Sequence, residues 1–365
     1  MAVIQKCKET MTVRERVLRT FHHEKTDRVT IGYEGNGGIT TRLMQALRAG
    51  SYDEMLDSLG VDYRGVMPPY TGPLLFRELP GRQVDPLDGY YTRWVEHQSG
   101  GYWDFCDFPL QNASVEEIAD FPVPDPDDFD VEAAYDSLRA LNGKYAIHIG
   151  HAGVPDVINS NGRIMGMEDV LVHLALENEA AIHFFHRRAD MYLRMMERTL
   201  ERCRGMIDFM WLGEDLGTQI APMISLKTYR HILRPIHEKF TALARAYDLP
   251  VLMHTCGSSS WAYEDMIEIG VTGVDTLQPE AVHMSPRYLK DTFGNRLCYR
   301  GCISTAGPLA YGTAQETREY CRETLEIMME GYGYHFAPTH AIQDNTPVEN
   351  VLAMYQAAHD FGVYT

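Results

Sequence analysis

A histidine and a cysteine stand two residues apart at His254 and Cys256, at the end of the apolar run PVLM at 250–253. Residues at i and i+2 of a β-strand lie on the same face. One imidazole and one thiolate on one face supply half of a tetrahedral zinc site. A His-x-Cys pair also arises by chance, but its place at a strand end, followed by Gly257 and a serine-rich helix start, favours a metal site. We therefore predict a zinc ion bound by His254 and Cys256.

Four other predicted strand ends finish in polar or reactive side chains. They are His148 and His151, Glu214 and Asp215, Cys302, and His340. Cys302 and His340 carry the softest of these groups, so they are the candidates for the remaining zinc ligands. Cys302 is alternatively a small buried apolar side chain, and His340 is alternatively an acid–base catalyst or a structural histidine. Glu214 and Asp215 are open to three interpretations: outer partners of the ligands, substrate ligands or helix caps.

The elements that would position these side chains alternate regularly along the chain. Strands are predicted at 28–34, 145–150, 206–215, 250–256, 271–278, 296–302 and 334–340. Amphipathic helices are predicted at 11–23, 131–142, 167–203, 226–247, 260–269, 285–293, 314–330 and 347–361, the first of them capped by Thr12 with Glu15 three residues later. Short apolar strands separated by helices are typical of a parallel sheet covered by helices. About seven or eight such units predict a single α/β domain over 1–365, a (β/α)8 TIM barrel with an N-terminal extension, whose working residues lie at the C-terminal ends of the strands.

Residues 51–130 differ from the rest of the chain. They contain several prolines and seven tyrosine and tryptophan side chains between 63 and 103, and residues 93–106 are predicted to form a hairpin. We expect an aromatic-rich insertion in the barrel domain, either a lid whose rings stack on a flat ligand or a small hairpin subdomain with its own core. The candidates for substrate contact are Tyr91 and Trp94 in this segment and His148 and Asp215 at the strand ends.

The composition limits the classes of protein that fit this chain. The 365 residues are 45% hydrophobic and 23% charged, with a formal net charge of −18. Such acidity repels nucleic acid and anionic membranes, and it either keeps the protein soluble or attracts a cationic partner surface. No apolar run approaches the roughly 18 residues of a membrane span. Seven scattered cysteines without a signal peptide argue against a disulfide framework, so we expect a cytoplasmic protein with reduced thiols.

Several long stretches resemble a known family. They are RERVLRTFHHEKTDRV at 14–29, GEDLGTQIAPMISLKTYRHILRPIHEKF at 213–240, HTCGSSS at 254–260, IEIGVTGVDTLQPEA at 267–281, FGNRLCYRGCIST at 293–305 and APTHAIQDNTPVENVLAMYQAAHDFG at 337–362. In these stretches the chain is similar to the uroporphyrinogen decarboxylase superfamily and, within it, to the cobalamin-linked methyltransferases. The similarity covers nearly the whole chain, is weakest at 60–130, and implies a (β/α)8 barrel.

The resemblance has consequences for the zinc ligands. The methyltransferase branch has a His-x-Cys pair at the position of His254 and Cys256 and a third zinc ligand on the last strand. The segment equivalent to an APGC-like motif of coenzyme M methyltransferases reads APTH here, so His340 takes the place of a cysteine. The third ligand is therefore His340 by position or Cys302 by chemistry. The GEDLGTQ and APTHAIQ segments look more like the branch that demethylates methoxylated aromatic compounds.

The chain resembles the decarboxylases themselves less closely. Uroporphyrinogen decarboxylases carry an arginine-bearing RQAGR segment after the first strand, which binds substrate carboxylates. The corresponding region here, GYEGNGGITTRLMQ at 32–45, has Arg42 as its single arginine. A pocket for a substrate with eight carboxylates needs cations, and this chain is strongly acidic.

The expected function is therefore transfer of a methyl group from a small-molecule donor, an aryl methyl ether, to the cob(I)alamin of a separate corrinoid protein. Zinc would act as a Lewis acid on the ether oxygen, and Glu214 or His340 would donate a proton or orient the substrate. Three alternatives remain: transfer from methylcobalamin to a thiol or pterin, a metal-free decarboxylase using Asp215 and His340, and a non-enzymatic tetrapyrrole-binding or corrinoid-chaperone barrel. A homodimer is one of the oligomeric states compatible with the sequence.

Overall fold

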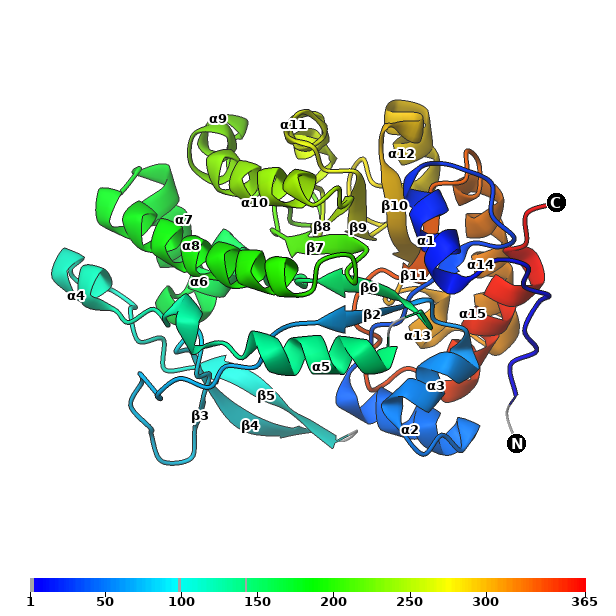
Figure 1. Cartoon of the computed structure of the whole chain (residues 1–365), viewed down its shortest axis with the longest axis horizontal. Coiled ribbons are helices and arrows are strands. Elements are labelled where there is room, and N and C mark those ends of the chain that lie inside the picture. The colour runs from blue at the N-terminus through cyan, green and yellow to red at the C-terminus, as the bar shows by residue number, and fades with distance from the viewer. Residues whose placement is uncertain (1–2, 98–99, 142) are drawn as a thin grey trace.

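Eight parallel strands form a barrel in the computed structural model, which describes residues 3–97, 100–141 and 143–365. Neighbouring strands pair in the order β1-β11-β10-β9-β8-β7-β6-β2. The strands are β1 (Thr30–Ile31), β2 (Tyr63–Val66), β6 (Ala146–Ile149), β7 (Phe209–Gly213), β8 (Val251–His254), β9 (Gly273–Leu277), β10 (Cys298–Ile303) and β11 (Tyr334–Pro338). Helices lie on the outside of these strands (Figure 1). This architecture confirms the predicted (β/α)8 barrel.

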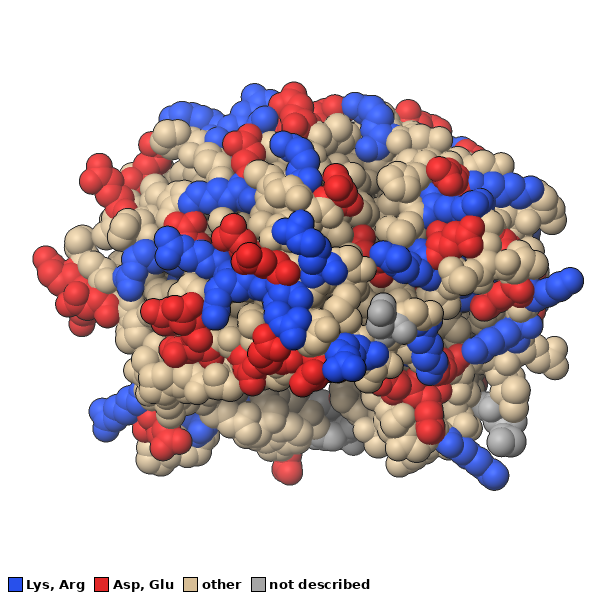
Figure 2. All heavy atoms as spheres, in the orientation of Figure 1, with Lys and Arg blue, Asp and Glu red and all other residues tan. Residues whose placement is uncertain are grey.

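Helices return the chain from each strand to the next. They are α2 (Gly37–Leu47) and α3 (Tyr52–Leu59) after β1; α4 (Val115–Asp120) and α5 (Val131–Leu141) before β6; α6 (Val157–Met165), α7 (Met167–Ala175) and α8 (Glu179–Arg202) after β6; α9 (Leu226–Thr228), the π-helical turn Tyr229–Leu233 and α10 (Arg234–Ala246) after β7; α11 (Tyr263–Ile269) after β8; α12 (Pro286–Phe293) after β9; α13 (Pro308–Tyr311) and α14 (Ala314–Met328) after β10; and α15 (Val348–Phe361) after β11. Among the described helices, none is both long and apolar enough to cross a bilayer. On the face shown in Figure 2, lysine and arginine side chains are interspersed with aspartate and glutamate. Ion pairs between exposed side chains, such as Arg202 Nε with Glu132 Oε1 at 2.5 Å, occur in this protein.

Helix α1 (Val13–Phe21) closes the N-terminal end of the barrel. Thr12 caps its first turn by accepting a backbone N–H at 3.2 Å, which confirms the predicted cap. Phe21 packs on Phe209 at the start of β7, with ring centroids 5.2 Å apart, and its carbonyl oxygen lies 3.5 Å from Cys298 Sγ at the start of β10. Because this end is filled, a ligand reaches the strands from their C-terminal ends, where barrel enzymes place their sites.

The end strands β1 and β2 are joined by Asp62. Its backbone N–H donates to Ile31 O at 2.9 Å, and its Oδ2 accepts the Ile31 N–H at 2.7 Å. The same buried carboxylate accepts hydrogen bonds from Arg16 Nη1 at 2.6 Å and Arg28 Nη1 at 2.7 Å. One side chain therefore holds the two end strands together and, with Asp27 and Glu9, offsets the charge of two buried guanidinium groups.

An antiparallel sheet of β3 (Gln83–Val84), β4 (Tyr91–His97) and β5 (Gly100–Cys106) lies between β2 and β6 in the sequence. It occupies the lower edge of the molecule in Figure 1, beneath α5. The pairing of β4 with β5 confirms the hairpin predicted at 93–106. The range 51–130 also contains α3 and the barrel strand β2, so the inserted part begins after β2.

The tyrosine and tryptophan side chains of this region do not form one surface. Tyr63 is buried inside the barrel, and the buried Tyr91 donates its hydroxyl proton to Arg77 O at 2.6 Å. Trp94 and Trp103 lie opposite each other on β4 and β5 with ring centroids 5.6 Å apart, and they are 50% and 43% exposed. The part of the aromatic segment that can meet a ligand or a partner is therefore the exposed outer half of the hairpin.

His335 of β11 lies inside the barrel, where both ring nitrogens are buried without a hydrogen-bond partner. Burial lowers the pKa of His335 to about 3, so the folded protein keeps the ring neutral while the unfolded chain protonates it near pH ~6.5. Stability from this residue is fully present above pH ~6.5 and is lost as the pH falls toward 3. We expect a loss of about 2 kcal/mol at pH ~5.

Urea unfolding at pH ~7 and pH ~5 measures this loss. The variant His335→Phe should lose about 2 kcal/mol less than the wild type between the two values, because phenylalanine takes up no proton. His231→Phe, at an exposed position, is the matched control and should keep the wild-type pH dependence. An identical pH dependence in His335→Phe and the wild type would contradict the prediction.

Candidate metal centre

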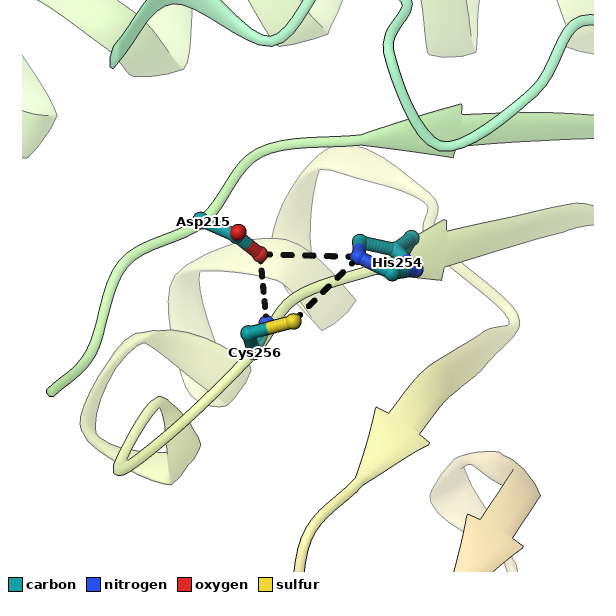
Figure 3. Close-up of side chains that lie close together, drawn as sticks. All are labelled: Asp215, His254 and Cys256. Atoms are coloured by element: carbon teal, nitrogen blue, oxygen red, sulfur yellow. Dashed lines mark hydrogen bonds and ion pairs between the residues drawn. The ribbon is translucent and has the colours of Figure 1, made fainter. Parts of the chain in front are cut away.

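Three potential metal ligands meet where β7 and β8 end (Figure 3). Asp215 follows β7, His254 is the last residue of β8, and Cys256 follows it. His254 Nε2 lies 3.4 Å from Cys256 Sγ and 3.5 Å from Asp215 Oδ1. One donor atom from each of the three residues lies within 4.8 Å of the other two. The imidazole and the thiol therefore share one space, together with a carboxylate.

These distances match the edges of a zinc coordination tetrahedron. Zinc lies about 2.3 Å from a thiolate sulfur and about 2.0–2.1 Å from an imidazole nitrogen, so tetrahedral angles place those two donors about 3.5 Å apart. An imidazole nitrogen and a carboxylate oxygen come about 3.4 Å apart by the same geometry. The observed separations of 3.4 Å and 3.5 Å agree with these values. Three protein ligands that leave a fourth position open are typical of catalytic rather than structural zinc.

The second nitrogen of His254 is held by residues of β9. Thr276 Oγ1 lies 2.5 Å and Asp275 Oδ2 lies 3.4 Å from His254 Nδ1. Such outer partners fix the orientation of a ligand ring and make its metal-facing nitrogen more basic. Asp275 in turn accepts a hydrogen bond from Arg300 Nη1 at 2.5 Å, and although burial opposes ionisation, the charge of Arg300 holds the pKa of Asp275 well below its ordinary value. The ring is thus positioned with Nε2 toward the other two ligands.

A β-bulge in β9 lets two consecutive residues reach this histidine. The pairing of β9 with β10 advances over 274–277 on one strand and over 299–301 on the other, so β9 carries one extra residue there. Consecutive side chains of a regular strand point to opposite faces, whereas Asp275 and Thr276 both approach His254. Thr276 has a φ of 60°, a conformation that costs a β-branched residue about 1–3 kcal/mol and is concentrated at functional sites.

Helix α6 orients Asp215 from the opposite side. Asn159 Nδ2 donates to Asp215 Oδ2 at 2.5 Å, while the Cys256 N–H donates to Asp215 Oδ1 at 2.7 Å. The adjacent Glu214 holds the start of the same helix, because its carboxyl group accepts the N–H groups of residues 157 and 158, both at 2.9 Å. Two consecutive acidic residues after β7 therefore connect α6 to the ligand cluster.

Three of the described acidic groups around the cluster have no lysine or arginine bound to them, unlike Asp275, which Arg300 neutralises. Among the described residues, no lysine or arginine forms an ion pair with Asp156, Glu214 or Asp215. Burial raises the pKa of Glu214 to about 8 and, with the neighbouring carboxylates, that of Asp156 to about 7. His237 Nε2 lies 3.1 Å from Glu214 Oε2, but burial lowers the pKa of His237 to about 4. Burial also raises the pKa of Cys256 to about 11, so a divalent cation would both offset the acidic charge and favour the thiolate.

The two residues considered for the third ligand lie elsewhere. Cys302 is fully buried in the hydrophobic core on β10, and burial raises the pKa of its thiol. His340 follows β11, is exposed, and lines a pocket together with Trp94. Within the described part of the chain, the group of potential metal ligands includes neither of them, and its third member is Asp215.

Two pockets open near the C-terminal ends of the strands. The smaller pocket has a volume of about 410 Å³, and its wall includes His148, Trp211, Tyr33, Tyr52 and Tyr63. The larger pocket has a volume of about 1040 Å³, and its wall includes Trp94, Tyr102, Trp103 and Phe105 on one side and His340, Gln343 and Asp344 on the other. The loop after β1 joins the pockets, since Gly35 lines the smaller one and Asn36 the larger one. Of the predicted substrate contacts, His148 and Trp94 thus line different pockets, and the buried Tyr91 lines neither.

Several residues of the site escaped prediction from the sequence. Asp275 lies inside the apolar stretch VTGVDTLQ at 271–278, and an acidic residue in a buried strand is a signal that its position could have given. Asn159 falls in the stretch between 151 and 166, for which no element was predicted. Asp215 was expected to contact substrate, and its place beside His254 depends on the pairing of β7 with β8.

The fold and the cluster together define a (β/α)8-barrel protein with a potential metal centre at its C-terminal mouth. Residues 109–361 match the protein family described as Uroporphyrinogen decarboxylase (URO-D). This match spans more than half of the chain, and the chain therefore belongs to that family. The resemblance noted in the sequence is confirmed.

A solved structure of low sequence identity shares the fold. A methyltransferase from Methanosarcina mazei is similar over 96% of this chain and 99% of its own length, with a TM-score of 0.60 and 16% identity. The alignment with the native xylanase 10B from Thermotoga maritima covers 96% of this chain and 98% of the xylanase chain, with a TM-score of 0.44 and 10% identity. No curated protein matches the sequence.

Proposed function

We propose that the protein is a zinc-dependent methyltransferase that moves a methyl group from an aryl methyl ether to the cob(I)alamin of a separate corrinoid protein. The cluster of Asp215, His254 and Cys256 carries the proposal, because its spacing suits three zinc ligands, the number that catalytic zinc sites combine with an open fourth position. A methyltransferase of the same fold, from Methanosarcina mazei, supports the class. In the overall reaction the methyl–oxygen bond breaks, the methyl group passes to cobalt, and the phenol oxygen takes up a proton.

The chain's own residues hold and orient the reacting groups. Zinc, when bound by His254, Cys256 and Asp215, would supply Lewis acidity toward an ether oxygen. Glu214 is fully buried and engaged by α6, which suits a positioning role rather than contact with substrate. His340 is exposed in the larger pocket, which makes it the acid–base candidate that a ligand there can reach.

The smaller pocket suits a donor with one aromatic ring. Its volume of about 410 Å³ lies within the roughly 300–1,000 Å³ of ligand pockets. Tyr63 in its wall accepts a hydrogen bond from Arg300 Nε at 2.7 Å, and Arg300 is bound to Asp275 beside His254. A donor in this pocket would therefore lie next to the residues that position the proposed metal ligand.

The larger pocket suits the flat macrocycle that a corrinoid protein carries. Its aromatic wall contains the half-exposed Trp94 and Trp103, and stacking adds about 0.5–1.5 kcal/mol per ring pair beyond the burial of area. Gly101 helps to form this wall, because a Cβ there would lie 2.2 Å from an atom of the Trp94 indole. The glycine therefore lets the indole lie across β5.

A polycarboxylate decarboxylase is less well supported by the chemistry of the pockets. Among the described residues that line them, Arg64 is the one arginine. Its guanidinium group is bound to Asp53 Oδ1 at 2.7 Å and to Asp57 Oδ1 at 2.9 Å. A substrate with several carboxylates needs cations that are available to it, and this guanidinium is already engaged.

Methylation of chemically reduced cobalamin, followed by its absorbance, tests the proposal. We expect turnover with methoxybenzene-type donors by zinc-loaded protein and by the control variant Cys7→Ser, and none with Cys256→Ala. Turnover with methanol or methylamine but not with aryl ethers would remove the aromatic donor. Methyl transfer from methylcobalamin to a thiol, with no activity in the forward direction, would assign the reverse reaction instead.

A further inference from the structure

The smaller pocket presents a neutral hydrogen-bond acceptor that the protein itself leaves unused, Nε2 of His148. The side chain is only 8% exposed, and its Nδ1 lies 3.1 Å from Gly150 O. A carbonyl oxygen only accepts, so Nδ1 carries the proton and Nε2 offers a lone pair. In the described part of the chain, His148 forms no hydrogen bond through Nε2.

Gly65 leaves this edge of the imidazole open. Gly65 pairs with His148 in the register of β2 and β6, is exposed, and also lines the pocket. A Cβ at residue 65 would lie 2.6 Å from His148 Cε1 and 2.9 Å from Nε2. Those distances are below van der Waals contact, so a ligand reaches Nε2 because residue 65 has no side chain.

The charges around the pocket favour a neutral donor over an anion. Burial lowers the pKa of His148 to about 3, so the ring stays neutral at physiological pH. Arg64 is bound by two aspartates, and Glu34 brings a carboxylate to the wall, 3.7 Å from Arg300 Nη1. A ligand carboxylate would lose its hydration here without gaining an available cation.

The aromatic walls of the smaller pocket favour a ligand with a flat ring. Trp211 packs on His148 with centroids 5.0 Å apart and an interplanar angle of 72°, and Tyr63 meets the same imidazole edge-on at 6.1 Å. The indole nitrogen of Trp211 is buried without a hydrogen-bond partner. Aromatic walls with few polar atoms that fix the orientation are typical of sites for small flat ligands.

We propose that this pocket binds a single aromatic ring bearing a hydroxyl group, and that the hydroxyl donates a hydrogen bond to His148 Nε2. The inference rests on the proposed function and defines its substrate class: a hydroxylated aryl methyl ether, in preference to an ether without a hydroxyl or to an aromatic carboxylate. One additional neutral hydrogen bond to an otherwise unpaired acceptor is expected to improve the Kd about tenfold.

Calorimetric titration of the full-length protein with 2-methoxyphenol, methoxybenzene and 4-methoxybenzoate tests this preference without added zinc or cobalamin. We expect the Kd of 2-methoxyphenol to be about tenfold lower than that of methoxybenzene, with the carboxylate binding most weakly. Equal affinity for the first two compounds, or tightest binding of the carboxylate, would overturn the inference. Tighter binding of a methylated ammonium ion than of 2-methoxyphenol would also overturn it.

Variants locate the contact within the pocket. His148→Leu and Gly65→Ala should each abolish the preference for the hydroxyl, whereas His148→Gln keeps an acceptor and should retain part of it. Gly50→Ala is the matched control, because its Cβ would meet only the flexible Glu54 carboxylate at 3.2 Å. A preference that persists in His148→Leu would remove His148 from the contact. Since this assay involves no methyl transfer, its failure leaves the cobalamin assay unaffected, and the reverse also holds.

Discussion

Wild-type protein is expected to hold one zinc ion per chain, and Cys256→Ala is expected to lose it. The thiolate is one of three potential ligands, and the separations of His254 from the other two fit a tetrahedron. Loss of an outer partner of a metal ligand costs about 10–100-fold in affinity, so loss of a ligand itself should cost at least about 100-fold. Elemental analysis of freshly purified protein and competition with a chelating dye measure the two quantities.

Control variants test whether zinc loss is specific to Cys256 among the thiols and whether the third ligand lies on the last strand. Cys7→Ser changes a partly exposed cysteine near His359 and should keep the zinc. Asp215→Ala should lose zinc and His340→Ala should keep it, because the cluster contains Asp215 and His340 lies in the larger pocket. The opposite pair of results would return the third ligand to the last strand, and zinc-free wild-type protein would refute the metal site.

Asp62→Ala is expected to lower the free energy of unfolding by about 3–5 kcal/mol. The carboxylate is fully buried and accepts hydrogen bonds from Arg16, Arg28 and the Ile31 N–H. Its removal takes away the one carboxylate that Arg16 and Arg28 share, leaving Arg16 with Asp27 and Arg28 with Glu9, and it frees the junction of β1 with β2. Chemical unfolding followed by circular dichroism measures the loss.

The same substitution at the surface provides the comparison. Asp53→Ala removes a half-exposed partner of Arg64, with the ion pair at 2.7 Å, and should change the unfolding free energy by less than about 1 kcal/mol. Equal effects at the two positions would show that Asp62 contributes no more than a surface ion pair.

Most of the barrel could be predicted because its strands are short apolar runs separated by amphipathic helices. β2 could not, because Arg64 and Gly65 interrupt the pattern of YRGV at 63–66. Arg64 is tolerated there through aspartates on α3 and a cation–π contact with Tyr145, 3.9 Å from the ring centroid. Those partners are tertiary contacts, and no local sequence pattern predicts them.

Part of the candidate metal centre could likewise be predicted from the sequence, and part could not. His254 and Cys256 could be predicted, because two residues of separation at a strand end place both side chains together. Asp215 joins them through the pairing of β7 with β8 and through its bond to Asn159. The sequence contains all four residues, but their meeting depends on which strands are neighbours and on where α6 begins.

Because β9 carries one extra residue, the candidate metal centre depends on the number of residues in this strand as well as on their types. A relative that retains His254 and Cys256 but lacks one residue in the 274–277 stretch would have a regular β9. Either the carboxylate or the hydroxyl would then point away from the imidazole, because neighbours on a regular strand face opposite sides. A search for the two ligands alone would accept such a chain, although the histidine would have lost its contact with either Asp275 or Thr276. The spacing between the end of β8 and the bulge is therefore a better mark of an equivalent site than the His-x-Cys pair by itself.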